Sequence, residues 1–357
     1  MKRITREELI ILAVAETTLV SLDLSGMDLS SLNLSGLIFE EVCLAGCDLT
    51  STDLSGSSFK GCDFRASVLR GANLAGANLG EASLASLDLG NADLTGAVLE
   101  KADLNGADLS GARMGHIEAG GIIMAGARLV GASLFMAMLA EADLAGADFT
   151  GADLSQADLE QAKLKGAVFN NTNCEKTYLQ NLDLQGLSFP RCNLVMAHFE
   201  GADLQGVDLS GLLLTQAGFE KANISGADLS GIDAWAARFE GAVAAGTRFA
   251  EARLADADFT ESSLEGADFT AALLTGARLI RAECRHATFR NADLSCADLS
   301  YAILTGAVFT NARLDQANMH KSMTTDAVWT GADTRTTRLT DDELAEAENW
   351  TAQTRNR

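Results

Sequence analysis

The stretch ADLAG-ADFTG-ADLSQ-ADL, residues 142–159, repeats a five-residue unit whose third residue is Leu or Phe. The same frame extends from Leu19 to Trp329, where every fifth residue gives 63 positions. All of them are Leu, Phe, Ile, Met or Trp, apart from Ala119, Cys174, Ala234, Ala244, Cys284 and Thr324. A five-residue period fits neither a helix nor a long strand. It predicts a three-residue strand followed by a turn, with Ala and Leu inward, Asp outward and Gly at the bend.

The phenylalanines report the size of the coil. Fourteen of the 15 occupy the central position of a unit, and 13 of those fall into two of the four phases of a 20-residue period. Residues 20 apart therefore behave as stacked neighbours, which predicts four units per coil and two aromatic columns on opposite sides of a square. The columns are Phe39, Phe59, Phe199, Phe219, Phe239 and Phe259, and Phe149, Phe169, Phe189, Phe249, Phe269, Phe289 and Phe309, ending at Trp329.

The pattern [Ala/Ser/Thr/Val]-[Asp/Asn]-[Leu/Phe]-x-x resembles the pentapeptide-repeat family over roughly nine-tenths of the chain. The resemblance implies an all-β fold, the right-handed quadrilateral parallel β-helix, here a solenoid of about 16 coils. Strands about 4.8 Å apart would make it roughly 75 Å long.

The two ends depart from the repeat. Thr5-Arg6-Glu7-Glu8 predicts a capping box that opens a helix over 7–15. Thr340-Asp341-Asp342-Glu343 predicts a second one, opening a helix to about Trp350. We interpret both as short capping helices; the alternative for the second is a docking role. The expected domains are residues 1–16 (N-terminal capping helix), 17–333 (β-helix) and 334–357 (C-terminal helix and tail).

Composition excludes several classes of protein. The 357 residues are 47% apolar and carry a net charge of −22, which disfavours disorder and direct contact with nucleic acid or an anionic membrane. No apolar run reaches the roughly 18 residues that span a bilayer. The seven cysteines form no CxxC pair, which favours a cytoplasmic location.

The sequence shows no constellation for catalysis. The four histidines occupy different columns or distant coils, and no two inward cysteines are 20 residues apart, so those cysteines are expected to be core residues. We expect no catalytic residues, no cofactor and no metal site, and therefore no enzyme.

Two surface features are candidate partner contacts. Glu200, Glu220 and Glu240 stand on successive coils of one column, which favours a basic partner or else a solvated face relieved by Lys221. Outward apolar residues form the second feature, and its candidate contacts are Phe135, Met136, Met138, Leu213 and Trp235. Phe135, Val195 and Trp235 share one outward column.

Three functions remain open. The first is a non-enzymatic protein-binding scaffold or adaptor. The opening Arg-Glu-Glu-Leu (6–9) and the closing Leu-Ala-Glu-Ala-Glu-Asn-Trp (344–350) resemble pentapeptide-repeat proteins associated with bacterial type VI secretion, which implies an effector or spike-associated partner. The second is an acidic DNA mimic that binds DNA gyrase or topoisomerase, as quinolone-resistance members of the family do. The third is a homodimer. The unbroken frame favours the first.

Overall fold

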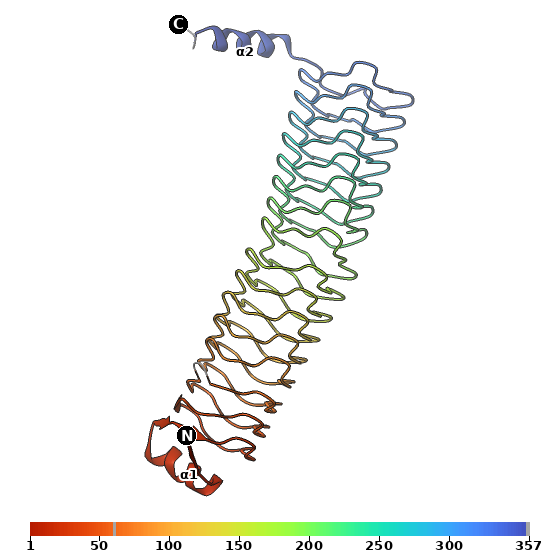
Figure 1. The fold of residues 1–357 in the computed structure, drawn as a ribbon. Helices are drawn as coiled ribbons and strands as arrows, with labels where there is room; N and C mark the ends of the chain where they lie inside the picture. The colour runs from red at the N-terminus through yellow and green to blue at the C-terminus, as the bar shows by residue number, and fades with distance from the viewer. Residues whose placement is uncertain (60–61, 355–357) are drawn as a thin grey trace. The chain divides into compact units, whose positions relative to one another are not determined.

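The computed structural model describes residues 1–59 and 62–354, with side chains as far as residue 348. The chain divides into two compact units. Unit 1 comprises Met1–Asp183 with Leu187–Asn193, and unit 2 comprises Leu184–Gly186 with Leu194–Arg357. Within each unit the backbone winds as successive stacked coils (Figure 1).

Backbone pairing in both units joins residues 20 apart. Asp28 pairs in parallel with Asp48 in unit 1, and Asp228 pairs with Arg248 in unit 2. The prediction of a four-sided coil of 20 residues is therefore confirmed, and the fold is the predicted right-handed quadrilateral β-helix. Each coil hands its backbone donors and acceptors to the next, so the polar groups of the short strands are satisfied along the stack.

The interior is built from the two inward positions of each unit. Central Leu or Phe residues and the Ala two residues before them are buried throughout. Phe219, Phe239 and Phe259 stack with ring centroids 4.9 and 4.6 Å apart. Phe249, from the other column, meets Phe239 edge-on at 5.7 Å. The two predicted aromatic columns thus meet across the core in the geometry that aromatic rings prefer.

The bends follow the expected position but not the expected residue. The second residue after each centre adopts a left-handed conformation, with φ of +68° at Gly151. Lys101 and Gln156 occupy the same position with φ of +55° and +58°. The stacked coils impose the turn, and residues with a Cβ accept the local cost of the left-handed region there.

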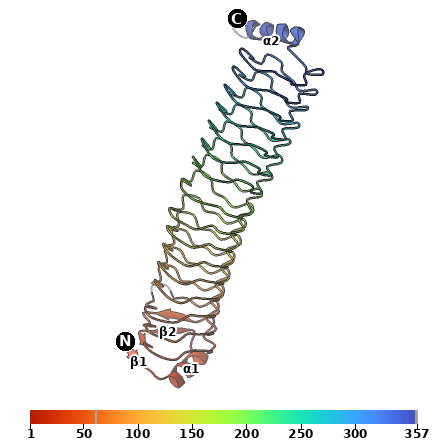
Figure 2. The same cartoon turned by 90° about the vertical axis from the view of Figure 1, so that its right-hand side faces the viewer.

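A helix closes the N-terminal end of unit 1 as predicted. Helix α1 (Arg6–Ala15) begins after Thr5, whose hydroxyl accepts the Glu8 amide hydrogen at 3.2 Å, and Glu8 Oε2 accepts the Thr5 amide hydrogen at 2.8 Å. The capping box is confirmed, and Leu9 is fully buried. The preceding β1 (Lys2–Arg3) pairs with β3 (Leu22–Asp23), and β2 (Thr18–Val20) pairs with β4 (Ile38–Glu40), so strand pairing reaches the first coil (Figure 2).

The C-terminal helix begins one residue later than predicted. Helix α2 spans Asp342–Thr354, and its first turn is capped by Asp341, whose Oδ1 accepts the Leu344 amide hydrogen at 3.0 Å. The prediction of a Thr340 cap is wrong because Asp341 caps equally well and lies one position closer. The packing predicted for Trp350 lies outside the described side chains.

Candidate functional site

The recurrent aspartates hold the turns. In most units that carry Asp at the outward position, one carboxylate oxygen accepts the amide hydrogen of the residue two positions later, as Asp108 does from Ser110 at 3.0 Å. Hydrogen bonds from the Ser110 hydroxyl and amide lower the pKa of Asp108, and Arg128 adds to the effect. The interpretation of these aspartates as turn residues is therefore confirmed.

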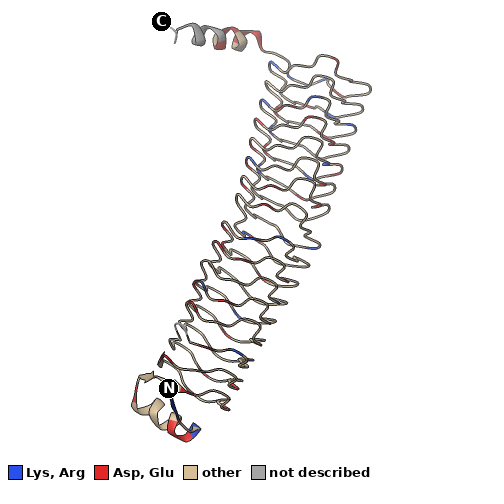
Figure 3. Ribbon diagram, viewed as in Figure 1, with Lys and Arg blue, Asp and Glu red and all other residues tan. Residues whose placement is uncertain are grey.

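Their second oxygen serves the next coil. Six aspartates use Oδ2 to pair with a base 20 residues later, at 2.9 Å for Asp228–Arg248 and 3.2 Å for Asp258–Arg278. The other four pairs are Asp93–Arg113, Asp108–Arg128, Asp143–Lys163 and Asp293–Arg313. Bases and acids are consequently interleaved along the coils of each unit (Figure 3). Much of the acidic charge is neutralised locally.

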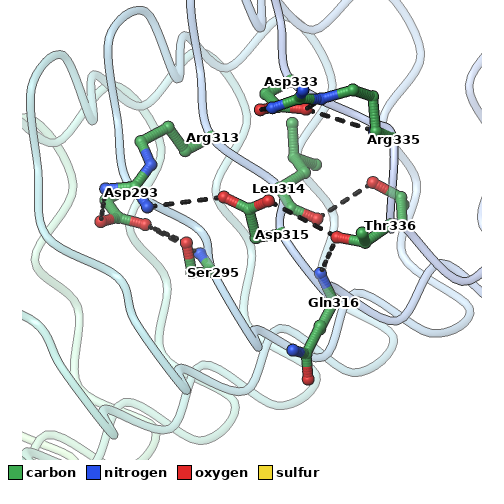
Figure 4. A network of polar contacts seen from close by, with 10 residues as sticks. Asp293, Ser295, Arg313, Leu314, Asp315, Gln316, Asp333, Arg335 and Thr336 are labelled. Atoms are coloured by element: carbon green, nitrogen blue, oxygen red, sulfur yellow. Dashed lines mark hydrogen bonds and ion pairs between the residues drawn. The ribbon is translucent and has the colours of Figure 1, made fainter.

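These contacts become a network in the last coils of unit 2. Arg313 lies 3.2 Å from Asp293 and 3.4 Å from Asp315. The Thr336 hydroxyl accepts the Gln316 amide hydrogen at 3.0 Å and donates to Asp315 at 3.5 Å (Figure 4). Polar contacts therefore join three successive coils on this face.

The predicted glutamate ladder is largely occupied from within. Glu200 and Glu220 both contact the Arg238 guanidinium, at 3.3 Å for Glu200. The hydrogen bond from Arg238 to Glu220 raises the pKa of that guanidinium, with the charges of both glutamates adding to the effect. Relief comes from Arg238 rather than from the expected Lys221. Of the three predicted contact carboxylates, Glu240 alone remains exposed.

A glycine makes this clamp possible. Gly218 lies between His198 and Arg238 in the same outward column. A Cβ at Gly218 would collide with Glu200 Oε1 and stand 2.7 Å from Arg238 Nη2. The second oxygens of Glu200 and Glu220 are buried without a protein hydrogen bond. The sequence signal was the absence of a side chain at position 218, flanked on both sides by residues that reach across it.

In unit 1 the predicted apolar contacts separate into two environments. Phe135 is half-buried because its ring packs edge-on against His116 at 5.4 Å. Met136 and Met138 are 42% and 50% exposed. The two methionine side chains, and not Phe135, are thus the accessible part of this surface.

In unit 2 Leu213 and Trp235 are 52% and 46% exposed. The Trp235 indole N–H donates to Asp256 Oδ2 at 3.1 Å, which fixes the orientation of the ring. An exposed aromatic side chain in one defined orientation loses little entropy on binding.

A thiol pair escaped the sequence reasoning. Cys174 and Cys192 are buried and hydrogen-bond to each other. That hydrogen bond raises the pKa of Cys174, which burial raises further, and it lowers the pKa of Cys192. Only a spacing of 20 was considered in the sequence, whereas a spacing of 18 places one inward position diagonally beside another.

The C-terminal end of unit 2 contains an open cavity of about 580 Å³. It is lined by residues of the last coil, among them Met319, Trp329, Thr334 and Leu339, and Leu339 is 72% exposed. This hollow arises because no coil follows to fill the inward positions.

Helix α2 is attached beside this end through Glu348. Its carboxylate contacts Lys321 and Tyr301 and lies 3.6 Å from His320. Hydrogen bonds from Lys321 and then Tyr301 lower the pKa of Glu348 to about 2. The link between helix and solenoid is therefore polar in its described part, whereas the sequence had suggested apolar packing.

Among the described residues no group of three or more His, Cys, Asp or Glu side chains could hold a metal ion. Within the same part of the chain, no helix is long and apolar enough to cross a membrane.

Comparison with known proteins agrees with this architecture. Chains of similar structure include HetL, involved in heterocyst differentiation in the cyanobacterium Nostoc sp. strain PCC 7120, at 22% identity over 92% of this chain and 96% of that one (TM-score 0.15). QnrB1, a plasmid-mediated fluoroquinolone resistance protein, matches at 18% identity over 51% and 91% (TM-score 0.27). Rfr23 from the cyanobacterium Cyanothece 51142 matches at 20% over 47% and 90% (TM-score 0.16).

No curated protein matches the sequence. The family model for pentapeptide repeats matches in eight copies, which together cover more than half of the chain: 47–84, 77–115, 127–166, 157–194, 192–231, 237–276, 267–300 and 292–323. The chain belongs to the pentapeptide-repeat family.

Proposed function

We propose that this protein is a non-enzymatic protein-binding scaffold whose coils present exposed apolar side chains to another protein. The observation that carries the proposal is the pair Met136 and Met138, 42% and 50% exposed on a coil of unit 1. Exposed methionines are common at protein-binding surfaces because the side chain is flexible and polarizable. Phe135, fixed against His116, gives them a rigid border.

The resemblance of residues 6–9 and 344–350 to members linked with type VI secretion supports a finer proposal. In it, the scaffold is an adaptor, and its partner is a secreted effector or a spike-associated protein. Such a partner would bury the methionines under its own apolar side chains, with polar contacts at the rim.

The experiment is affinity capture with mass spectrometry, using the native chain and the double variant Met136→Ser/Met138→Ser. The matched control is Val168→Ser, which removes a side chain 45% exposed elsewhere in the same unit. We expect an effector or spike component to be captured by the native chain and the control, and lost with the double variant. Equal capture by all three chains would refute the methionine surface, and capture of no secretion component would refute the adaptor role.

The acidic DNA mimic is the second candidate, and the net charge of −22 is what favours it. The arrangement of that charge weighs against it. Duplex DNA presents about one unpaired negative charge per 1.7 Å of axis. Here many carboxylates already hold a turn amide with one oxygen and a base with the other, as Asp228 does with Ser230 and Arg248.

A further inference from the structure

One outward column of unit 2 carries alternating charges between two leucines. Successive parallel pairings join its members one coil apart: Leu213, Asp233, Arg253, Leu273, Asp293, Arg313 and Asp333. At about 4.8 Å per coil the column extends over roughly 29 Å. Leu213 and Leu273 are 52% and 47% exposed, so the column is accessible along its length.

Arg253 is the unusual member. In neighbouring columns of unit 2 the base pairs with the acid one coil earlier, at 2.9 Å for Arg248–Asp228 and 3.2 Å for Arg278–Asp258. Asp233 lies one coil before Arg253, yet Arg253 forms no ion pair with any carboxylate of the described residues. An exposed cation and a nearby anion are thus both available on this face.

The column is complementary to its own reverse. We propose that a second copy of this chain docks antiparallel on this face, with the two-fold axis at Leu273. Arg253 then faces Asp293 of the second copy, Asp233 faces Arg313 of the second copy, and each contact occurs twice. Isologous pairing of this kind requires a surface that complements itself under two-fold rotation.

The register follows from the charges. Moving the axis one coil toward the N-terminus sets Arg253 against itself, and moving it one coil toward the C-terminus sets Asp293 against itself. Like charges in direct opposition disfavour such registers. With the axis at Leu273, two exposed leucine side chains meet at the centre and the charges lie outside them.

The adjacent column permits close approach. Ala255, Thr275 and Ser295 stand two positions after Arg253, Leu273 and Asp293, and all three are small. Trp235, 46% exposed and held by Asp256, lies further along the same face. Short side chains at the centre and a fixed aromatic ring nearer the edge are features of a contact surface.

Sedimentation velocity over rising concentration tests the proposal. We expect the native chain to form a dimer, and Leu273→Asp and Leu273→Arg each to remain monomeric because two like charges would meet at the axis. An equimolar mixture of the two variants should dimerise again, since opposite charges then face each other. Val243→Asp, which changes a side chain 45% exposed on a different face, should dimerise like the native chain.

Three outcomes would overturn the proposal: a native chain that stays monomeric, a dimer unaffected by either charge, or variants whose mixture does not dimerise. Circular dichroism melting confirms that the variants are folded. This inference goes beyond the proposed scaffold function and uses unit 2, whereas the methionine surface lies in unit 1. Loss of partner capture with intact dimerisation, or the reverse, therefore distinguishes the failure of one proposal from the failure of the other.

Discussion

Arg248 and Asp228 illustrate how one carboxylate serves two coils. Oδ1 of Asp228 accepts the Ser230 amide hydrogen at 3.0 Å, and Oδ2 lies 2.9 Å from Nη2 of Arg248, 20 residues later. A repeat that seemed to require Asp only for its turn thereby also connects neighbouring coils on the outside.

This division predicts unequal effects of removing the two partners. Asp228→Ala loses the turn hydrogen bond and the ion pair and should lower the free energy of unfolding by about 1–2 kcal/mol. Arg248→Met loses only a largely exposed pair, worth about 0.2–1 kcal/mol. Denaturant unfolding followed by circular dichroism measures both. Asp228→Asn keeps a turn acceptor and should resemble Arg248→Met; an effect as large as that of Asp228→Ala would contradict the assignment.

The aromatic column makes a core prediction. Phe239 is fully buried between Phe219 and Phe259 and touches Phe249 edge-on. Phe239→Ala should destabilise unit 2 by about 3–5 kcal/mol, because a cavity replaces the ring. Phe239→Leu, which restores the residue found in most units, should cost less than about 1.5 kcal/mol. Equal unfolding midpoints for the two variants would show that the column contributes no specific packing.

The clamp at Gly218 predicts a strong effect for a surface arginine. Arg238→Ala leaves Glu200 and Glu220 close together and partly buried, so we expect a loss of about 1–3 kcal/mol in unfolding free energy. Arg285→Ala is the matched control, since its pair with Glu283 is well exposed on both sides. Thermal melting of the two variants should rank Arg238→Ala clearly lower. Identical melting curves would mean that the two carboxylates do not depend on Arg238.

The attachment of α2 should depend on pH. The pKa of Glu348 is lowered to about 2 from an ordinary value of 4.5. A lowered carboxyl pKa stabilises the folded contact above the ordinary value, and this contribution is lost as pH falls through the lowered one. Hydrogen exchange in 341–354 should therefore rise, relative to Glu348→Gln at the same pH, between about pH 4.5 and 2. Native and variant chains that exchange alike at pH 7 would show that Glu348 does not hold the helix.

The pairing of acids with bases also predicts the outcome of a supercoiling assay. Purified protein should neither inhibit DNA gyrase nor protect it from a quinolone, because little unpaired acidic charge is left to imitate DNA. The measurement is agarose-gel separation of topoisomers over a protein titration. Dose-dependent inhibition at low salt that disappears at high salt would favour the DNA mimic instead.

The interior was predictable because its period is strict. Phenylalanine phase alone gave the coil size, and the Thr5–Glu8 capping box gave α1. The exterior was less predictable because its contacts are diagonal or depend on reach. Arg238 crosses Gly218 to reach Glu200, and Cys174 meets Cys192 at a spacing of 18. A vertical stacking rule cannot anticipate either contact. The start of α2 was misplaced because Thr340 and Asp341 are both competent caps.

The pairing of each base with the acid one coil earlier constrains how such a chain can gain or lose length. Deleting residues 239–258 would remove one coil and still place Phe259 on Phe219, so the interior would close without a defect. The same deletion would remove Asp258 and set Arg278 directly after Arg238. Recombination between repeats is therefore tolerated by the core at any whole coil, while the surface charges mark which coils belong next to each other.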